Sequence, residues 1–190
     1  LMSKLYQKNI YSVPKIKKIV INMGLGADAS DQKILKSCIK DISAITGQYP
    51  ITTKFKKSIS NFKSRKGTNA GLKVTLRNHR MFEFLDRLVN IALPRIKDFR
   101  GLVDTGCDKS GNYSFGIKEH IIFPEINFDK VEKIRGLDVT IVTDSRSAED
   151  TISLLKEFNF PIVKGSKKKA KKIKKIPKEE NKKEEKEKNG

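Results

Sequence analysis

The longest acid-free segment of the chain is strongly cationic. Residues 42–82 contain no Asp or Glu in 41 positions and hold nine Lys or Arg. A surface that only had to stay soluble would mix the two signs of charge. Lys and Arg can contact phosphate oxygens, and the interspersed Ser, Thr and aromatic residues add neutral hydrogen bonds and stacking surfaces. The chemistry that fits this segment is non-covalent binding of a polyanion; a solvated hairpin is the plainer alternative.

The residue types that carry catalysis or bind metals are few and scattered. His79 and His120 are the only histidines, and neither has a Cys, Asp or Glu at the spacing of a metal site or a catalytic triad. The two cysteines lie 69 positions apart and show no CxxC pattern. Glu119 and Glu125 are more typical of a solvated face than of a catalytic carboxylate pair. We therefore expect no enzymatic activity, no metal and no cofactor.

One glycine motif supports a different hypothesis. Residues 24–29 read Gly-Leu-Gly-Ala-Asp-Ala and match G-x-G-x-x-A between an expected strand and an expected helix, the context of a dinucleotide fold. A second parallel strand ending in an acidic residue should follow that helix, but Gln48-Tyr49-Pro50 and then three lysines come instead. A nucleotide-cofactor enzyme using Gly24–Ala29 is kept as the alternative function, and a simple glycine turn is the plainer interpretation.

The charge of the whole chain also favours a polyanionic partner. Its 190 residues carry 41 Lys and Arg against 22 Asp and Glu, a net charge of +19. Residues 164–190 contribute 13 Lys and 5 Glu, so residues 1–163 keep a net charge of +11. We expect one domain over residues 1–163 and a disordered Lys/Glu-rich tail over 164–190. No apolar run approaches 18 residues and no signal core is visible, so no membrane partner is expected, although a Lys-rich tail working at a membrane surface is a weaker option.

The hydrophobic periodicity alternates between two and 3.6 residues, which predicts an α+β domain with an open, largely antiparallel sheet and helices packed on one face. Three helices are expected, over 31–46, over 78–92 and from a cap at Ser147 to Phe158. The first has Ser30 as its cap, Cys38 in the core and Gly47 at its end. Strands are expected over 16–23, 58–62, 72–77, 112–117 and 137–143, with a basic loop, 63–71, joining the second and third and a polar loop over 101–111.

Strict alternation suggests where a binding surface lies. If Leu72, Val74 and Leu76 pack on the helices, Lys73, Thr75 and Arg77 project from the opposite face, where Lys18 and Asn22 of the first strand join them. Such a face is a platform for RNA, and it lacks the aromatic ladder that reads splayed bases. The remaining candidates from the basic segment are Thr53, Lys56, Lys57 and Ser58.

Five long motifs resemble one known family, the bacterial form of the large-subunit ribosomal protein that binds 5S ribosomal RNA. They are VPKIKKIVINMGLG, KVTLR, MFEFLDRLVNIALPRIKDFRGL, GNYSFGIKEHIIFPEI and RGLDVTIVT, and they occur in the family's order over residues 13–162. The resemblance implies a place in the central protuberance of the large subunit, in a ribosome of the bacterial cytoplasm or the mitochondrial matrix. It also implies contacts with large-subunit ribosomal RNA and with neighbouring large-subunit proteins.

The resemblance further assigns residues to partners. It implies that Asn22, Gln48, Thr75 and Arg77 lie at the 5S surface. The basic loop would reach toward peptidyl-site transfer RNA, and the Gly101–Gly111 loop would bridge to a small-subunit head protein. The loop residues implied in the transfer RNA contact are Lys63, Arg65, Lys66, Thr68 and Asn69.

Overall fold

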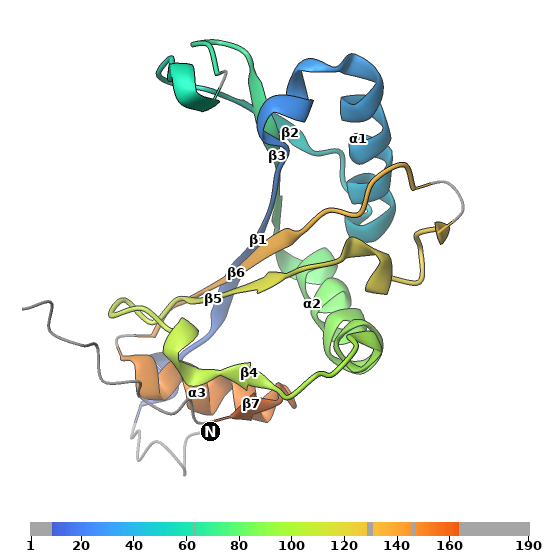
Figure 1. The fold of residues 1–190 in the computed structure, drawn as a ribbon. Helices are drawn as coiled ribbons and strands as arrows, with labels where there is room; N and C mark the ends of the chain where they lie inside the picture. Colours follow the sequence, from blue (N-terminus) through green and yellow to red (C-terminus); the bar gives the residue numbers. More distant parts are fainter. Residues whose placement is uncertain (1–8, 63, 129–130, 146, 164–190) are drawn as a thin grey trace, which may run out of the picture.

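The structure, a computed structural model, describes residues 9–62, 64–128, 131–145 and 147–163 (Figure 1). Its main feature is a five-stranded antiparallel sheet in the order β2-β3-β1-β6-β5. The strands are β1 (Ile16–Gly24), β2 (Ile51–Lys54), β3 (Asn69–Leu76), β5 (Tyr113–Ile117) and β6 (Leu137–Thr143). The first strand of the chain is therefore the central strand of the sheet.

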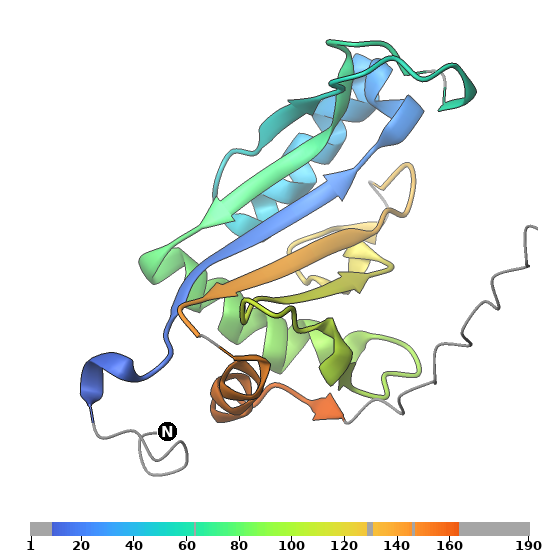
Figure 2. The same cartoon turned by 90° about the vertical axis from the view of Figure 1, so that its left-hand side faces the viewer.

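The helices leave one side of this sheet uncovered. In Figures 1 and 2, α1 (Gln32–Thr46) and α2 (Asn78–Arg87) lie on the same face, and α3 (Ala148–Glu157) lies beyond the end of the sheet where β1 begins. The α2 helix continues through a π-helical turn, Leu88–Ala92, and a 3₁₀ turn, Leu93–Arg95. A separate parallel pair joins β4 (Leu102–Val103) to β7 (Ile162–Val163). Further 3₁₀ turns span Ile10–Ser12, Gly26–Ser30, Ser60–Phe62, Asp104–Gly106 and His120–Ile122.

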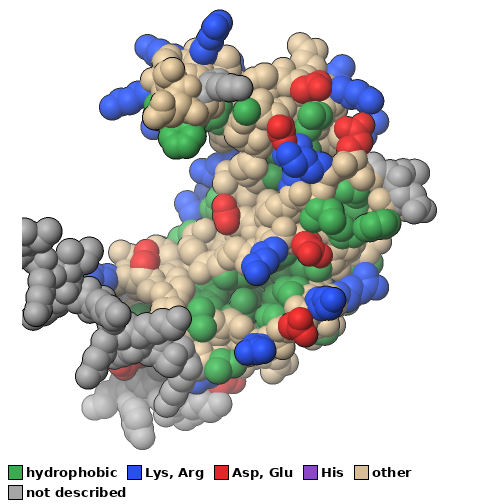
Figure 3. All heavy atoms as spheres, viewed as in Figure 1, with side chains coloured by type: hydrophobic (Ala, Val, Ile, Leu, Met, Phe, Trp, Pro, Cys, Tyr) green, Lys and Arg blue, Asp and Glu red, His purple; other side chains and the backbone are tan. Residues whose placement is uncertain are grey.

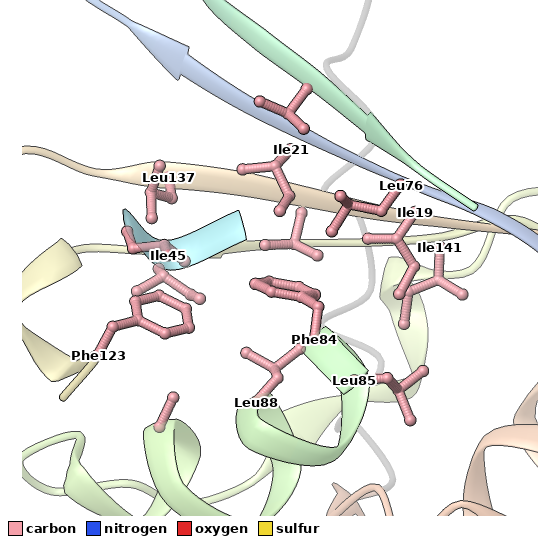
Figure 4. Packing of buried hydrophobic residues seen from close by; sticks show 14 of the residues in the cluster. Ile19, Ile21, Ile45, Leu76, Phe84, Leu85, Leu88, Phe123, Leu137 and Ile141 are labelled. Carbon is pink, nitrogen blue, oxygen red and sulfur yellow. The ribbon is translucent and has the colours of Figure 1, made fainter. Parts of the chain in front are cut away.

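The core lies between the sheet and the two helices. Register places Ile19 opposite Leu76 and Ile21 opposite Val74, so the buried residues of β1 and β3 form one apolar surface. Figure 4 shows Phe84 of α2 beneath Ile19, Ile21 and Leu76. The Phe84 ring stacks on that of Phe123, with centroids 5.9 Å apart. Because this layer buries one face of every central strand, it fixes which side chains the opposite face presents.

The helix ends follow capping rules, with one correction. Gly47 ends α1 with φ of 65°, and the Ser147 hydroxyl accepts a hydrogen bond from the Asp150 N–H at 3.2 Å at the start of α3, both as expected. The prediction that Ser30 caps α1 is wrong. The Asp31 carboxylate accepts from the Lys33 N–H at 2.8 Å, while Ser30 belongs to the preceding 3₁₀ turn.

The predicted strand over 58–62 is also wrong. The strand on the outer side of β3 is β2, a segment for which no strand was expected, and residues 60–62 form a 3₁₀ turn. The segment Ser58–Phe62 was expected to form a hairpin with β3 across the basic loop, but it lies beyond the end of β3, and its pairing among the described residues is an isolated bridge from Ile59 to Ser64. The sheet therefore gains its edge strand from the β-branched run Ile51-Thr52-Thr53.

The expected fold class is confirmed, although β3 begins at Asn69, inside the expected loop 63–71. The domain is α+β, its sheet is open and antiparallel, and α1 and α2 cover one face. Cys38 is a core residue, 4% exposed. The expected polar loop 101–111 contains the two residues of β4. The predicted tail, 164–190, lies outside the described residues.

Replacement of Phe84 by Ala tests the assignment of the core. Its ring is 1% exposed and contacts both layers, so the truncation should lower the free energy of unfolding by about 3–5 kcal/mol. Urea denaturation followed by circular dichroism measures the change. The matched control is Phe128→Ala, because that ring is 67% exposed and its loss should cost less than about 0.5 kcal/mol. Equal losses in the two variants would contradict the assignment.

Candidate nucleic-acid interface

The uncovered face of the sheet carries ordered rows of polar side chains. Directly opposite residues of antiparallel strands present their side chains on the same face. One row runs across four strands from Ile51 through Lys73 and Asn22 to Asp138. We call this surface, built from the outward-pointing residues of the five strands, the open face.

A second row of the open face has no charge. It consists of Thr75, Val20, Thr140 and Ser114, and the hydroxyls of the last two lie 3.1 Å apart. A third position pairs Lys18 with Val142. Arg77 continues the alternation of β3 with extended backbone, φ −140° and ψ 162°, and its side chain is exposed. The cations of the open face thus lie on β1 and β3, whereas the β5–β6 side carries Asp138 and small side chains.

The connection from β2 to β3, residues 55–68, projects from one corner of the sheet, and we call it the arm (Figure 2). Its base is closed by the Phe55 N–H donating to the Thr68 carbonyl at 2.9 Å and the Gly67 N–H donating to the Phe55 carbonyl at 3.0 Å. Farther out, Ile59 and Ser64 exchange two backbone hydrogen bonds of 3.1 and 3.2 Å. Figure 3 shows Lys and Arg side chains gathered around the arm, next to an exposed apolar patch.

The structure divides the predicted 5S residues between these two surfaces. The open face holds Lys18, Asn22, Thr53, Lys73, Thr75 and Arg77. The exposed Lys56, Lys57 and Ser58 lie instead on the arm, where the Ser58 hydroxyl accepts from the Lys66 N–H at 3.0 Å. Gln48 occupies the turn from α1 to β2, held by the Thr46 hydroxyl through its backbone.

Three of the residues expected at the transfer RNA contact, Arg65, Lys66 and Thr68, belong to the returning half of the arm. Arg65 and Lys66 are exposed, and the Thr68 hydroxyl donates to the Arg65 carbonyl at 2.7 Å. Asn69 is the first residue of β3 and pairs with Lys54. Lys63 lies outside the described residues.

Among the residues of the open face that sequence reasoning missed, one lies against its cations. Ile51 is 73% exposed and lies directly opposite Lys73, so an aliphatic side chain borders the cations. The signal that could have found it was the β-branched run that follows Pro50, which marks the true edge strand.

The glycine motif does not form a dinucleotide site. Gly24 ends β1 and residues 26–30 form a 3₁₀ turn, but every partner of β1 is antiparallel. The parallel strand-helix-strand unit that such a site requires is therefore missing from the described sheet, and the cofactor-enzyme alternative is wrong. Leu25 and Ala29 are instead buried in the core, and the turn connects β1 to α1.

Asp28 connects this turn to the segment that precedes β6. Its carboxylate accepts hydrogen bonds from Lys133 Nζ at 2.8 Å and from the Arg135 guanidinium at 3.0 Å. The hydrogen bonds from Lys133 and Arg135 lower the pKa of the Asp28 carboxyl below its usual value. The two cations precede β6, so the ion pairs connect the turn after β1 to the entry of its neighbouring strand.

The Gly101–Gly111 loop lies at the opposite end of the sheet and is held by its own contacts. The Tyr113 hydroxyl donates to the Val103 carbonyl at 2.9 Å, and burial raises the pKa of Tyr113 to about 12. The Asp108 carboxylate accepts from the N–H groups of Ser110 and Asn112, and these bonds, led by the backbone N–H of Asn112, lower the pKa of Asp108. The loop therefore has a defined conformation at its base and its tip.

Two kinds of feature are absent from the described residues. No three His, Cys, Asp or Glu side chains there lie close enough together to hold a metal ion. Among the helices of the described part, none has the length and apolar character needed to cross a membrane.

A helix-backed antiparallel sheet with one cationic, polar face defines a class of protein that binds through a sheet surface. Family comparison then gives the particular case: residues 9–65 match the model described as Ribosomal protein L5, and residues 69–162 match the model described as ribosomal L5P family C-terminus. The chain belongs to the ribosomal protein L5 family. It is a structural protein of the large ribosomal subunit and not an enzyme.

Curated relatives agree over most of the chain. The large ribosomal subunit protein uL5 of Pelagibacter ubique (strain HTCC1062) is 64% identical over 157 residues, which cover 83% of this chain and 85% of that protein. The proteins of the same name from Desulforamulus reducens and Geotalea uraniireducens are 52% and 53% identical, over 87% and 85% of this chain and 92% and 90% of those proteins.

The Asp28 ion pairs predict a specific acid sensitivity. A carboxyl whose pKa is lower in the folded state contributes stability above its unfolded pKa, near 3.9, and loses that contribution as the pH falls through the folded value. Asp28→Asn should therefore be less stable than the wild type at pH 7, and the gap should shrink below about pH 4. Urea midpoints from pH 3 to pH 7 measure it. Asp138→Asn is the control, since Asp138 is exposed and makes no ion pair with the described residues; a parallel pH profile for both variants would contradict the assignment.

Proposed function

We propose that this large-subunit protein binds 5S ribosomal RNA through the cationic half of the open face. The observation that supports the proposal is the continuous surface of Lys73, Thr75, Arg77, Lys18 and Asn22 on two paired strands. Its lysines and arginine can neutralise phosphates, while Thr75 and Asn22 supply hydrogen bonds to sugar hydroxyls and base edges. The surface that favours phosphate ends at Asp138 on β6, because the charge of this carboxylate repels phosphate.

The side chains also indicate the mode of recognition. The open positions of β1 and β3 carry Lys18, Val20, Asn22, Lys73 and Thr75, and none of these five is aromatic. A sheet that reads splayed bases presents stacking rings on these strands. We therefore propose recognition of a paired region through its backbone, 2′-hydroxyls and shallow minor groove.

Removal of two cations tests this surface. Lys73→Ala combined with Arg77→Ala should weaken the binding of a 5S transcript by about 30-fold or more, because each of the two charge-assisted contacts contributes about 1–3 kcal/mol. The salt dependence of binding should also become shallower, since fewer counterions are released. Filter binding at several salt concentrations measures both effects.

The control removes the same charge from the covered side of the molecule. Lys36 and Lys40 are exposed on α1, behind the sheet, so their joint replacement by Ala should leave the 5S affinity within about twofold of the wild type. Unchanged 5S binding by a folded Lys73 and Arg77 double variant would exclude the open face as the site.

For the arm we propose a different RNA partner, peptidyl-site transfer RNA. The family resemblance implies this contact, and two features of the structure support it. The arm projects beyond one corner of the sheet, on the side that α1 and α2 leave uncovered, and Arg65 and Lys66 are exposed on it without an acidic residue anywhere between 42 and 82. A projecting cationic segment can reach a ligand that the sheet itself does not contact.

Charge removal on the arm should separate the two partners. Arg65→Ala combined with Lys66→Ala should speed the dissociation of transfer RNA from the peptidyl site of reconstituted ribosomes by about 5- to 10-fold, while 5S affinity stays within about twofold. Both measurements are made on one preparation of the variant. Loss of 5S affinity as well would move the arm into the 5S site, and no effect on either RNA would leave the arm a solvated hairpin.

The Gly101–Gly111 loop is our candidate for the contact with a small-subunit head protein. Its anchoring by Tyr113 and by the Asp108 turn presents a defined surface, and the two carboxylates Asp104 and Asp108 favour a basic partner. The remaining partners, large-subunit ribosomal RNA and neighbouring large-subunit proteins, are proposed from the family resemblance.

A further inference from the structure

One aromatic ring on the arm lies mostly in solvent. Phe62 is 73% exposed, although its neighbour Ser64 is buried. The exposed Phe82 stacks on Phe158 with centroids 6.3 Å apart, but no ring contact of this kind involves Phe62 among the described residues. A phenyl ring at such a position leaves a large apolar surface in water, which favours a partner that covers it.

The backbone beneath this ring is held in place. Phe62 ends the 3₁₀ turn Ser60–Phe62, and the two hydrogen bonds between Ile59 and Ser64 close that turn. The Ser64 hydroxyl adds a third bond of 3.3 Å to the Ile59 carbonyl. A ring mounted on a closed turn loses little conformational freedom on binding, so it is suited to contact a flat ligand.

The charges along the arm determine which flat ligand fits. Lys56, Lys57, Arg65 and Lys66 are exposed on the same arm, and Figure 3 shows basic side chains around its apolar patch. No acidic residue occurs in this part of the sequence. An apolar protein partner gains nothing from the surrounding cations, whereas an RNA base is linked through its ribose to phosphates that the cations attract.

We propose that Phe62 is a stacking platform for an unpaired base of RNA, with the neighbouring cations contacting the phosphates that flank that base. The inference rests on the proposed role of the arm in RNA binding and adds the kind of element it recognises: a single-stranded or looped nucleotide, in contrast to the paired region proposed for the open face. Stacking accepts any base, so the site selects unpaired structure more than sequence.

The absence of tryptophan from the 190 residues allows a direct test with the full chain. F62W keeps a stacking ring and introduces the only indole of the protein. A 12-nucleotide oligouridine should quench its fluorescence strongly on binding, whereas a 24-base-pair RNA duplex should bind the cationic protein with little quenching. F128W is the matched control, because Phe128 is similarly exposed at 67% but lies outside the acid-free segment, and its signal should respond weakly to both RNAs.

A second variant measures the contribution of the ring to affinity. F62L keeps an apolar side chain but loses the ring, so its Kd for the oligouridine should rise by about fivefold or more while the slope of log Kd against log salt stays unchanged. Equal quenching of F62W by duplex and single strand, equal quenching of F62W and F128W, or an unchanged Kd for F62L would each overturn the proposal. The 5S affinity of F62L should match that of the wild type, so failure of the stacking site is distinguishable from failure of the open face.

Discussion

The central position of β1 is the constraint on which the rest of the domain depends. Both edges of this strand are paired, with β3 and with β6, so each of its side chains points either into the helical layer or out to the open face. Ile19, Ile21 and Met23 occupy the first direction and are almost completely buried. A slip of one residue in either pairing would exchange the two sets and place Lys18 and Asn22 in the core. The apolar layer and the cationic face are thus enforced by the same register.

Polar contacts within the helical layer hold that register from behind. Arg87 of α2 donates to the Ile45 carbonyl near the end of α1 at 3.0 Å and pairs with the Glu125 carboxylate. His120 is buried, and its Nδ1 accepts from the Arg135 N–H at 3.1 Å at the entry to β6. A half-buried ion pair and a buried imidazole are costly to leave unpartnered, so these contacts favour a single packing of the helices on the sheet. The side chains of the open face therefore do not have to contact one another to keep the strands in register.

The two proposed RNA surfaces differ in how the backbone supports them. Open-face side chains are spaced by the ladder, which gives a rigid pattern suited to the regular shape of a paired RNA. The pairing of β1 with β3 ends next to the arm, where Gly71 lies opposite Gly24, and a Cβ on Gly71 would lie 2.5 Å from the Met23 carbonyl oxygen. This close approach of β3 to β1 ends the regular rows, and beyond it only local hydrogen bonds such as those between Ile59 and Ser64 shape the chain. An irregular surface with an exposed ring suits an irregular partner.

Periodicity in the sequence by itself determined most of the domain. It located β1, β3, β5, β6 and the three helices, the buried Cys38 and the face that carries Lys73, Thr75 and Arg77, because a buried strand or helix must repeat its apolar residues at the spacing of its own geometry. Only the tertiary structure decided which segment formed the edge strand. Both Ser58–Phe62 and Ile51–Lys54 precede β3 in the sequence, but only the latter lies alongside β3, and pairing depends on what is adjacent in space. The same reason explains the two-residue pair of β4 and β7 and the division of the predicted RNA residues between open face and arm. It also explains why the dinucleotide-like motif forms a turn, which Lys133 and Arg135 hold from more than a hundred residues away.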